Sequence, residues 1–136
     1  MLLINSLVII GQNINTEVKI DPNTKITIGD ESVLKVENNT YLIKYLNKVR
    51  YLNYEIVDDQ IIKIIIKSYY DNIEELNSDY DNIVNNLLND SPLYWQVSEN
   101  VCMIYSATYE IMVTKNELHT EIVFIDLTNE QQKLLK

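Results

Sequence analysis

The stretch DNIEELNSDYDNIVNNLLN, residues 71–89, decides the fold. Asp71 with Glu74 three residues later is typical of a helix-capping pair, and Asp90-Ser91-Pro92 is expected to end the helix. We predict one amphipathic helix over about 71–89, with an alternative in which Asn77-Ser78-Asp79 divides it in two. Its apolar residues recur every three or four positions, as on one face of an α-helix: Ile73, Leu76, Tyr80, Ile83, Val84, Leu87 and Leu88.

Segments on both sides of this helix show the alternation of apolar and polar residues that is typical of β-strands. Asn38-Asn39, Asp58-Asp59 and Asn116-Glu117 each stand between two such segments, so each is expected to turn a hairpin. The pattern predicts strands over residues 14–20, 25–28, 32–37, 40–46 and 49–57, and then over 94–97, 101–106, 109–114 and 119–127.

Residues 60–70 admit two interpretations. Lys63 and Lys67 stand four apart, so a helix would place both on one face. The density of β-branched isoleucine favours a strand, which we predict here. Thr128-Asn129-Glu130-Gln131 is typical of a helix start and predicts a short C-terminal helix. Together these patterns predict a single α+β domain over 1–136, mostly antiparallel strands with one long amphipathic helix.

The composition excludes several classes of protein. Cys102 is the only cysteine, which rules out an internal disulfide and any multi-cysteine metal site. Glycine occurs only at positions 11 and 29, so neither a Gly-rich dinucleotide motif nor a P-loop can be built. Abundant Ile and Asn with one Ala and one Arg indicate an AT-rich genome, cellular, viral or phage. Ten Tyr stand against a single Phe, so an aromatic ring with a polar tip is favoured.

The first eleven residues are largely apolar but do not match a secretory signal. They lack a basic start, Asn5-Ser6 interrupts the apolar run, and no small-residue cleavage site follows. The run is also far shorter than the about 20 residues that a membrane-spanning helix needs. We therefore expect a cytoplasmic protein with no membrane anchor.

Two residue types that often carry catalysis occur once each. His119 has Glu121 two residues later, and on a strand both side chains would project from one face, where the carboxylate can orient the imidazole. The sequence places no nucleophile or electrostatic stabiliser beside them, which favours a surface histidine. Cys102 lies in the apolar stretch Val101–Ile104 and is expected to be a buried, unreactive thiol. We predict a protein that is not an enzyme, with no catalytic residues and no cofactor.

The acidic residues are concentrated in one part of the chain. The net charge is −9, and the segment Ser68–Thr114 holds eight acidic residues and no Lys or Arg. Asp79-Tyr80-Asp81 begins like a calcium loop, but Ile83 stands where the third oxygen ligand belongs, so we predict no metal site. The helix is expected to present a negative outer surface that comprises Asp71, Glu74, Glu75, Asp79 and Asp81.

A concentrated negative surface favours docking of a basic partner, because a field of one sign steers association. The same charge disfavours direct binding of nucleic acid. The sequence thus predicts a non-catalytic protein-binding module, most concretely a small acidic inhibitor or immunity-type factor. It would occlude a basic, nucleic-acid-handling protein by imitating phosphates. Aromatic residues that flank the helix in sequence are predicted to rim this surface: Tyr69, Tyr70, Tyr94 and Trp95.

Two other interpretations stay open. In the second, the chain is a structural or assembly subunit of a virion or multisubunit complex and self-associates through strand edges and tyrosines. A concentration-dependent oligomer without any partner would distinguish this class. The third interpretation is a small hydrolase, which requires that turnover of a substrate collapse in His119→Ala.

Overall fold

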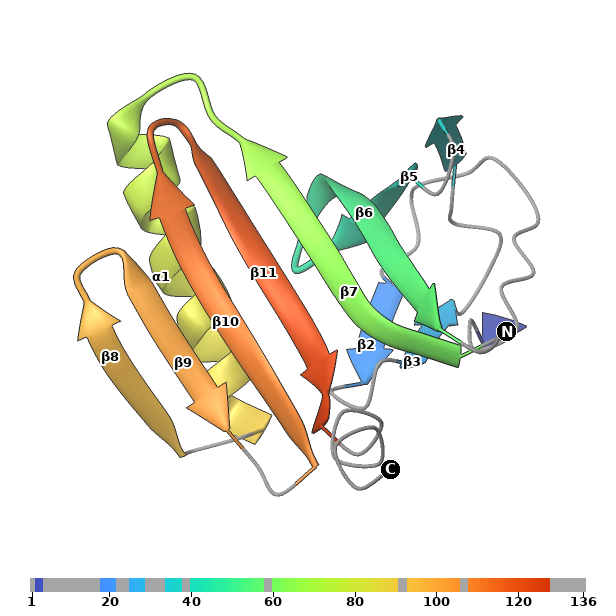
Figure 1. The fold of residues 1–136 in the computed structure, drawn as a ribbon. Coiled ribbons are helices and arrows are strands. Elements are labelled where there is room, and N and C mark those ends of the chain that lie inside the picture. The colour runs from blue at the N-terminus through green and yellow to red at the C-terminus, as the bar shows by residue number, and fades with distance from the viewer. Residues whose placement is uncertain are drawn as a thin grey trace.

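The computed structural model describes residues 2–3, 18–21, 25–28, 34–37, 40–57, 60–90, 93–105 and 108–127. Over these residues the chain forms an eight-stranded antiparallel sheet, a three-stranded sheet and one α-helix (Figure 1). The elements are β1 (Leu2–Leu3), β2 (Val18–Asp21), β3 (Lys25–Ile28), β4 (Leu34–Glu37), β5 (Thr40–Tyr45), β6 (Lys48–Val57), β7 (Gln60–Tyr69), α1 (Ile73–Asp90), β8 (Tyr94–Ser98), β9 (Val101–Tyr105), β10 (Tyr109–Asn116) and β11 (His119–Asp126).

The large sheet is built from two meanders that meet at its centre. Its strand order is β4-β5-β6-β7-β11-β10-β9-β8, so the first four strands and the last four each run as consecutive antiparallel neighbours. The two halves join where β11 pairs with β7. Helix α1 connects β7 at the centre to β8 at the far edge, and it crosses β11, β10 and β9 on the way (Figure 1). The α+β class predicted from the sequence is therefore confirmed.

The core lies between α1 and one face of the large sheet. The helix buries the side chains of Leu76, Tyr80, Ile83 and Leu87, which recur at the predicted helical spacing. On the sheet, alternate residues of each strand point to this face. Ile20 of β2 packs against the same core, so the three-stranded sheet covers the same side as the helix. The sheet residues of the core are Tyr41, Ile43, Tyr45, Leu52, Tyr54, Ile64, Ile66, Cys102, Ile104, Ile111, Val113, Ile122 and Phe124.

The predicted strand over 60–70 is confirmed, since β7 is a continuous ten-residue strand. Its β-branched isoleucines alternate between two faces, which a helix would not allow. The hairpin predicted between β6 and β7 is also present as an antiparallel pair. The short C-terminal helix predicted from Thr128 falls outside the described residues. The strand segment predicted over 14–17 does so too.

The helix begins later than predicted and is not divided. The cap is Asn72 rather than Asp71: the Glu75 N–H donates to Asn72 Oδ1 at 2.9 Å. Tyr70 is still held by the sheet, because its N–H donates to the Leu118 carbonyl at 2.9 Å. The chain can therefore turn into a helix only after residue 70. The expected break at Asn77-Ser78-Asp79 is absent, and α1 runs through it without interruption.

A two-residue turn joins β5 to β6 with unusual backbone angles. Leu46 and Asn47 have φ of 50° and 63°, which is the left-handed pattern of a type I′ hairpin turn. Asn tolerates this conformation, whereas for Leu it costs roughly 1–2 kcal/mol. The Leu46 side chain packs against the core, and its carbonyl accepts a hydrogen bond from Arg50. These contacts hold a residue in a conformation that its type disfavours.

Candidate functional site

A buried arginine organises the region where α1 meets the sheet. Arg50, the only arginine in the sequence, is 0% exposed and lies at an inward-facing position of β6. Each of its five N–H donors has an acceptor. Nε donates to the Tyr45 carbonyl (2.6 Å), Nη1 to Ser68 Oγ (2.9 Å) and Asp79 Oδ2 (2.7 Å), and Nη2 to the Leu46 carbonyl (3.2 Å) and Asp79 Oδ1 (3.0 Å).

The carboxylate of Asp79 is the hub of this cluster on the helix side. It takes a bidentate pair of hydrogen bonds from Arg50, the geometry that suits a guanidinium best. It also accepts a short hydrogen bond from the Tyr70 hydroxyl, which in turn lies 2.7 Å from Thr120 Oγ1. We call Arg50, Ser68, Tyr70, Asp79 and Thr120 the arginine cluster.

The protonation of the arginine cluster follows from these contacts. Burial acts to raise the pKa of Asp79, but the hydrogen bonds and charge of Arg50 outweigh it and hold the pKa below its usual value. Burial, together with the hydrogen bond to the Asp79 carboxylate, raises the pKa of Tyr70 to about 12. Near neutral pH the cluster is therefore an ionised Arg–Asp pair with a protonated phenol.

The arginine cluster has a structural role. It ties the β5–β6 turn, β7, β11 and α1 to one another, and every buried side-chain N or O atom of the described residues has a hydrogen-bond partner. The cluster fixes the N-terminal half of α1 on the sheet.

An acidic concavity lies on the solvent side of the arginine cluster. Its volume is 550 Å³, it is shallow, and residues of α1 line it together with Lys48. The Lys48 ammonium lies 5.0 Å from the centroid of the Tyr70 ring, so it borders the concavity. Asp79 is mostly buried at its base and already neutralised by Arg50. The lining residues are Lys48, Glu74, Glu75, Ser78, Asp79 and Asn82.

The structure divides the five predicted acidic residues into two groups. Asp71, Glu74, Glu75 and Asp81 are exposed, and Glu74 and Asp81 stand seven residues apart, which places them on one stripe of the helix. Among the described residues, neither Glu74 nor Asp81 forms an ion pair. Asp79 differs because its side chain is only 13% exposed and is paired with Arg50. Asp79 therefore holds α1 on the sheet and contributes less to the outer acidic surface than the four exposed acids.

Of the predicted aromatic rim, the structure places Tyr69 and Tyr70 on different faces of the sheet. Tyr69 and Tyr70 are neighbours on an extended chain, so their side chains point to opposite faces of the sheet. Tyr69 is 59% exposed on the face away from α1, whereas Tyr70 is 7% exposed and belongs to the arginine cluster. Tyr94 and Trp95 lie on β8, whose strand bounds the sheet at the edge where α1 ends. Their side chains are outside the described part of the structure.

The two candidate catalytic residues occupy different sites. His119 packs against Tyr69 on the face away from the helix, with ring centroids 5.9 Å apart. Glu121 lies on the same face, but its carboxylate is 3.9 Å from the Lys67 ammonium. Cys102 is fully buried in the core, and burial raises the pKa of its thiol. The structure thus brings the cysteine and the histidine to opposite faces of one sheet.

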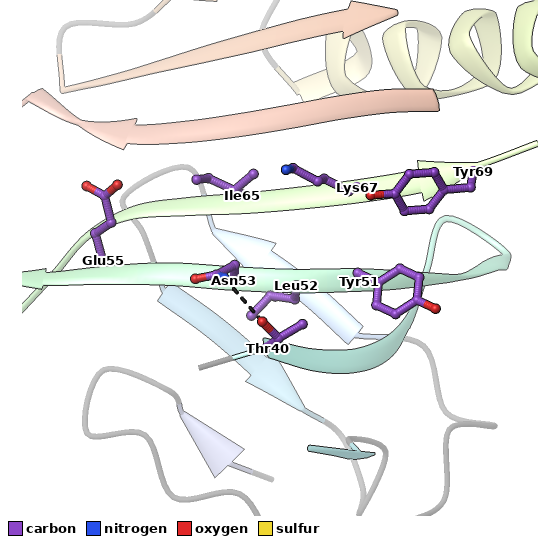
Figure 2. Close-up of a pocket in the computed structure, with 8 residues that line it drawn as sticks. All are labelled: Thr40, Tyr51, Leu52, Asn53, Glu55, Ile65, Lys67 and Tyr69. Atoms are coloured by element: carbon purple, nitrogen blue, oxygen red, sulfur yellow. Dashed lines mark hydrogen bonds between the residues drawn. The ribbon is translucent and has the colours of Figure 1, made fainter. Parts of the chain in front are cut away.

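The face of the large sheet away from α1 is a second surface of interest. No described helix or strand lies across it, and it is turned toward the viewer in Figure 1. Over β5, β6 and β7 it forms a concavity of 570 Å³. Figure 2 shows Tyr51, Tyr69, Ile65 and Lys67 on this side, with Asn53 donating a hydrogen bond to Thr40 Oγ1 at 3.2 Å. We call this surface the open face.

Two features of the sequence point to the arginine cluster, which the local patterns alone did not predict. Arg50 shares the parity of Leu52 and Tyr54, which marks it as an inward-facing strand position. Asp79 stands three residues after Leu76 and four before Ile83, so it lies toward the apolar side of the helix. Neither position shows which charged group meets which, because that depends on strand order.

Comparisons with protein-family models, with curated proteins and with solved structures each find no match. Within the described residues, no helix is long and apolar enough to cross a membrane. The same part of the chain contains no group of three or more His, Cys, Asp and Glu side chains arranged to hold a metal ion. The assignment of a function therefore rests on the surfaces described above.

Proposed function

We propose that this protein is a non-catalytic binding domain that engages a basic partner protein through the exposed acids of α1. Its most concrete form is a small acidic inhibitor or immunity-type factor that occludes a nucleic-acid-handling protein. The observation that supports this best is the outer stripe of the helix, where Glu74 and Asp81 are exposed and form no ion pair with any described residue. Helix α1 carries no Lys or Arg of its own, and although Lys48 and Lys115 reach it from the sheet, the charges on its outer surface are predominantly negative.

The arginine cluster adds a second line of support. A binding surface that is already rigid loses less conformational entropy on association. The bidentate Arg50–Asp79 pair and the Tyr70 hydrogen bond hold the first half of α1 in place. Glu74 and Glu75 are therefore presented beside the acidic concavity on a fixed frame, where a partner's Lys or Arg side chain can enter.

Affinity capture with charge-reversed variants tests this proposal. Tagged wild-type protein is incubated with lysate of a host-like cell, and bound proteins are eluted in rising salt and identified by mass spectrometry. We expect a basic partner that is released as salt rises, because screening weakens contacts between exposed charges. The variant Glu74→Lys with Asp81→Lys should lose this partner, since it replaces attraction by repulsion on the outer stripe.

The matched control reverses two acids on the opposite side of the sheet. Glu55→Lys with Glu121→Lys changes the net charge by the same amount but leaves α1 untouched. Both residues lie on the open face. The proposal requires capture to survive in this control, with circular dichroism confirming that both variants are folded. Equal loss of the partner in both variants would show that only net charge matters and would refute a helix-specific surface.

A further inference from the structure

We propose that the open face is a homodimer interface, on which a second copy of this chain packs its own open face. This inference is independent of the basic partner proposed above, because it concerns the other side of the sheet. In such a dimer the two sheets form the inner layers and the two α1 helices lie on the outside. Both acidic surfaces then remain free.

The middle of the open face is an apolar row that runs across several strands. Ile65 on β7 is in register with Val123 on β11, Val123 with Met112 on β10, and Met112 with Met103 on β9. Residues in register on adjacent strands point to the same side, so these four side chains lie next to one another. Ile65, Met112 and Met103 keep part of their surface accessible, whereas Val123 between them is 3% exposed. Apolar residues at the centre of a surface are typical of the core of a protein interface.

Aromatic side chains continue this surface toward one end of the strands. Tyr51 and Tyr69 are both large and exposed, and their rings meet edge to face with centroids 5.8 Å apart. His119 follows on the other side of Tyr69. Tyr is enriched at interfaces because it buries much area with few rotatable bonds. An exposed pair of tyrosines beside an apolar row thus supplies the anchors that an interface needs.

The charges of the open face favour a second copy of this chain over a partner whose surface is predominantly positive or predominantly negative. From β5 to β9 its described residues include three lysines and three glutamates, so the face is neutral in a protein with a net charge of −9. Two ion pairs border the apolar row, Lys67–Glu121 at 3.9 Å and Lys63–Glu55 at 4.0 Å. A twofold axis can set the lysines of one copy against the glutamates of the other, because an isologous contact uses the same patch twice.

Other occupants fit less well. A nucleic acid would meet Glu55, Glu110 and Glu121 together with the lysines, and phosphate binding needs a positive surface. An area estimate agrees with a dimer: eight strands about 4.8 Å apart, with a mean length of about 24 Å, present roughly 900 Å². A stable interface of standard size buries about 800 Å² on each partner. The open face is therefore large enough to hold two copies together.

The test is the molar mass of complementary charge variants, measured by light scattering after gel filtration. Wild-type protein at about 100 μM should have the mass of a dimer. This concentration is high enough to populate a dimer whose Kd is micromolar. Glu55→Lys with Glu121→Lys makes the face basic, and Lys63→Glu with Lys67→Glu makes it acidic. Each variant alone should dimerise at least about a hundredfold more weakly, because like charges then face one another. An equimolar mixture of the two should restore the dimer.

The control is the helix variant Glu74→Lys with Asp81→Lys, which should remain a dimer. The proposal is overturned if wild-type protein is a monomer at the highest concentration tested. It is also overturned if both open-face variants dimerise as tightly as the wild type, since another surface would then hold the dimer. Circular dichroism of each variant separates loss of association from loss of folding. Loss of the basic partner in the capture experiment leaves these outcomes unaffected.

Discussion

The two faces of the large sheet are made by alternate residues of the same strands, but their ion pairs differ in distance and in exposure to solvent. On the helix side, Arg50 and Asp79 approach to 2.7 Å with side-chain exposures of 0% and 13%. On the open face, Lys67 and Glu121 are 3.9 Å apart with exposures of 46% and 29%. Neither member of the first pair can be replaced alone without leaving a buried charge of the other, whereas both members of the second pair are accessible to solvent. The helix side of the sheet thus forms the core, and the open face is the side that we propose for association.

The largest effect is expected from Asp79→Asn. The substitution keeps the shape of the side chain but leaves the buried guanidinium of Arg50 without a counter-charge. Removal of one member of a buried pair costs about 3–5 kcal/mol. Urea unfolding followed by circular dichroism should report a loss of that size. A loss below about 1 kcal/mol would mean that the pair is as weak as an exposed one.

A double-mutant cycle with Arg50→Met sharpens this expectation. Arg50→Met should itself be strongly destabilising, because Asp79 then stays partly buried without its guanidinium. The double variant should lose less than the sum of the two single losses, since neither charge remains unpaired. Strict additivity would contradict a direct coupling between the two side chains.

A smaller loss is expected from Tyr70→Phe. The ring stays in place, but the hydroxyl that bonds Asp79 and Thr120 is removed. Hydrogen bonds to charged groups contribute about 1.5–3 kcal/mol, and we expect a loss in unfolding free energy within this range. Tyr69→Phe is the matched control: its side chain is exposed, so the same chemical change should alter stability by less than about 0.5 kcal/mol.

Acid is expected to remove the contribution of Asp79 to the stability of the folded protein. Its pKa is lower in the folded protein than in the unfolded chain, so its stabilisation is present above the ordinary value of about 3.9. It is lost as the pH falls through the folded pKa. Asp79→Asn cannot titrate, so the stability difference between wild type and variant should shrink from pH 7 toward pH 3. A constant difference across this range would rule out the linkage.

The smallest effect is expected on the open face. Lys67→Ala removes a lysine from an ion pair that is loose and half exposed. Exposed ion pairs contribute about 0–1 kcal/mol to stability. The free energy of unfolding, measured under conditions that keep the protein monomeric, should therefore change by no more than this. A loss comparable to that of Asp79→Asn would mean that the two faces do not differ as described.

The sequence predicted those elements whose pattern is local. Helix α1 follows from the spacing of Leu76, Tyr80 and Ile83, and β7 from its β-branched isoleucines. The helix cap is Asn72 and not the predicted Asp71, because the backbone of Tyr70 is still bonded to the Leu118 carbonyl. That bond joins residues far apart in sequence. Local patterns carry no information on such contacts.

The candidate site was predictable only in part for the same reason. The exposure of Glu74 and Asp81 follows from their positions opposite the apolar stripe. The burial of Asp79 depends on Arg50, which the strand order brings beneath the helix. Tyr70 joins this cluster because β11 lies beside β7 and supplies Thr120. The pairing of the two meanders is a tertiary choice that sequence periodicity does not determine.

The most direct test of the proposed function is the salt dependence of binding between the captured partner and purified protein. Its Kd is measured by calorimetry at several salt concentrations for the wild type and for Glu74→Lys with Asp81→Lys. We expect the variant to bind at least about tenfold more weakly at low salt, with a shallower dependence on salt, because contacts between opposite charges are lost. Unchanged affinity and unchanged salt dependence would contradict the assignment of the α1 surface as the docking site.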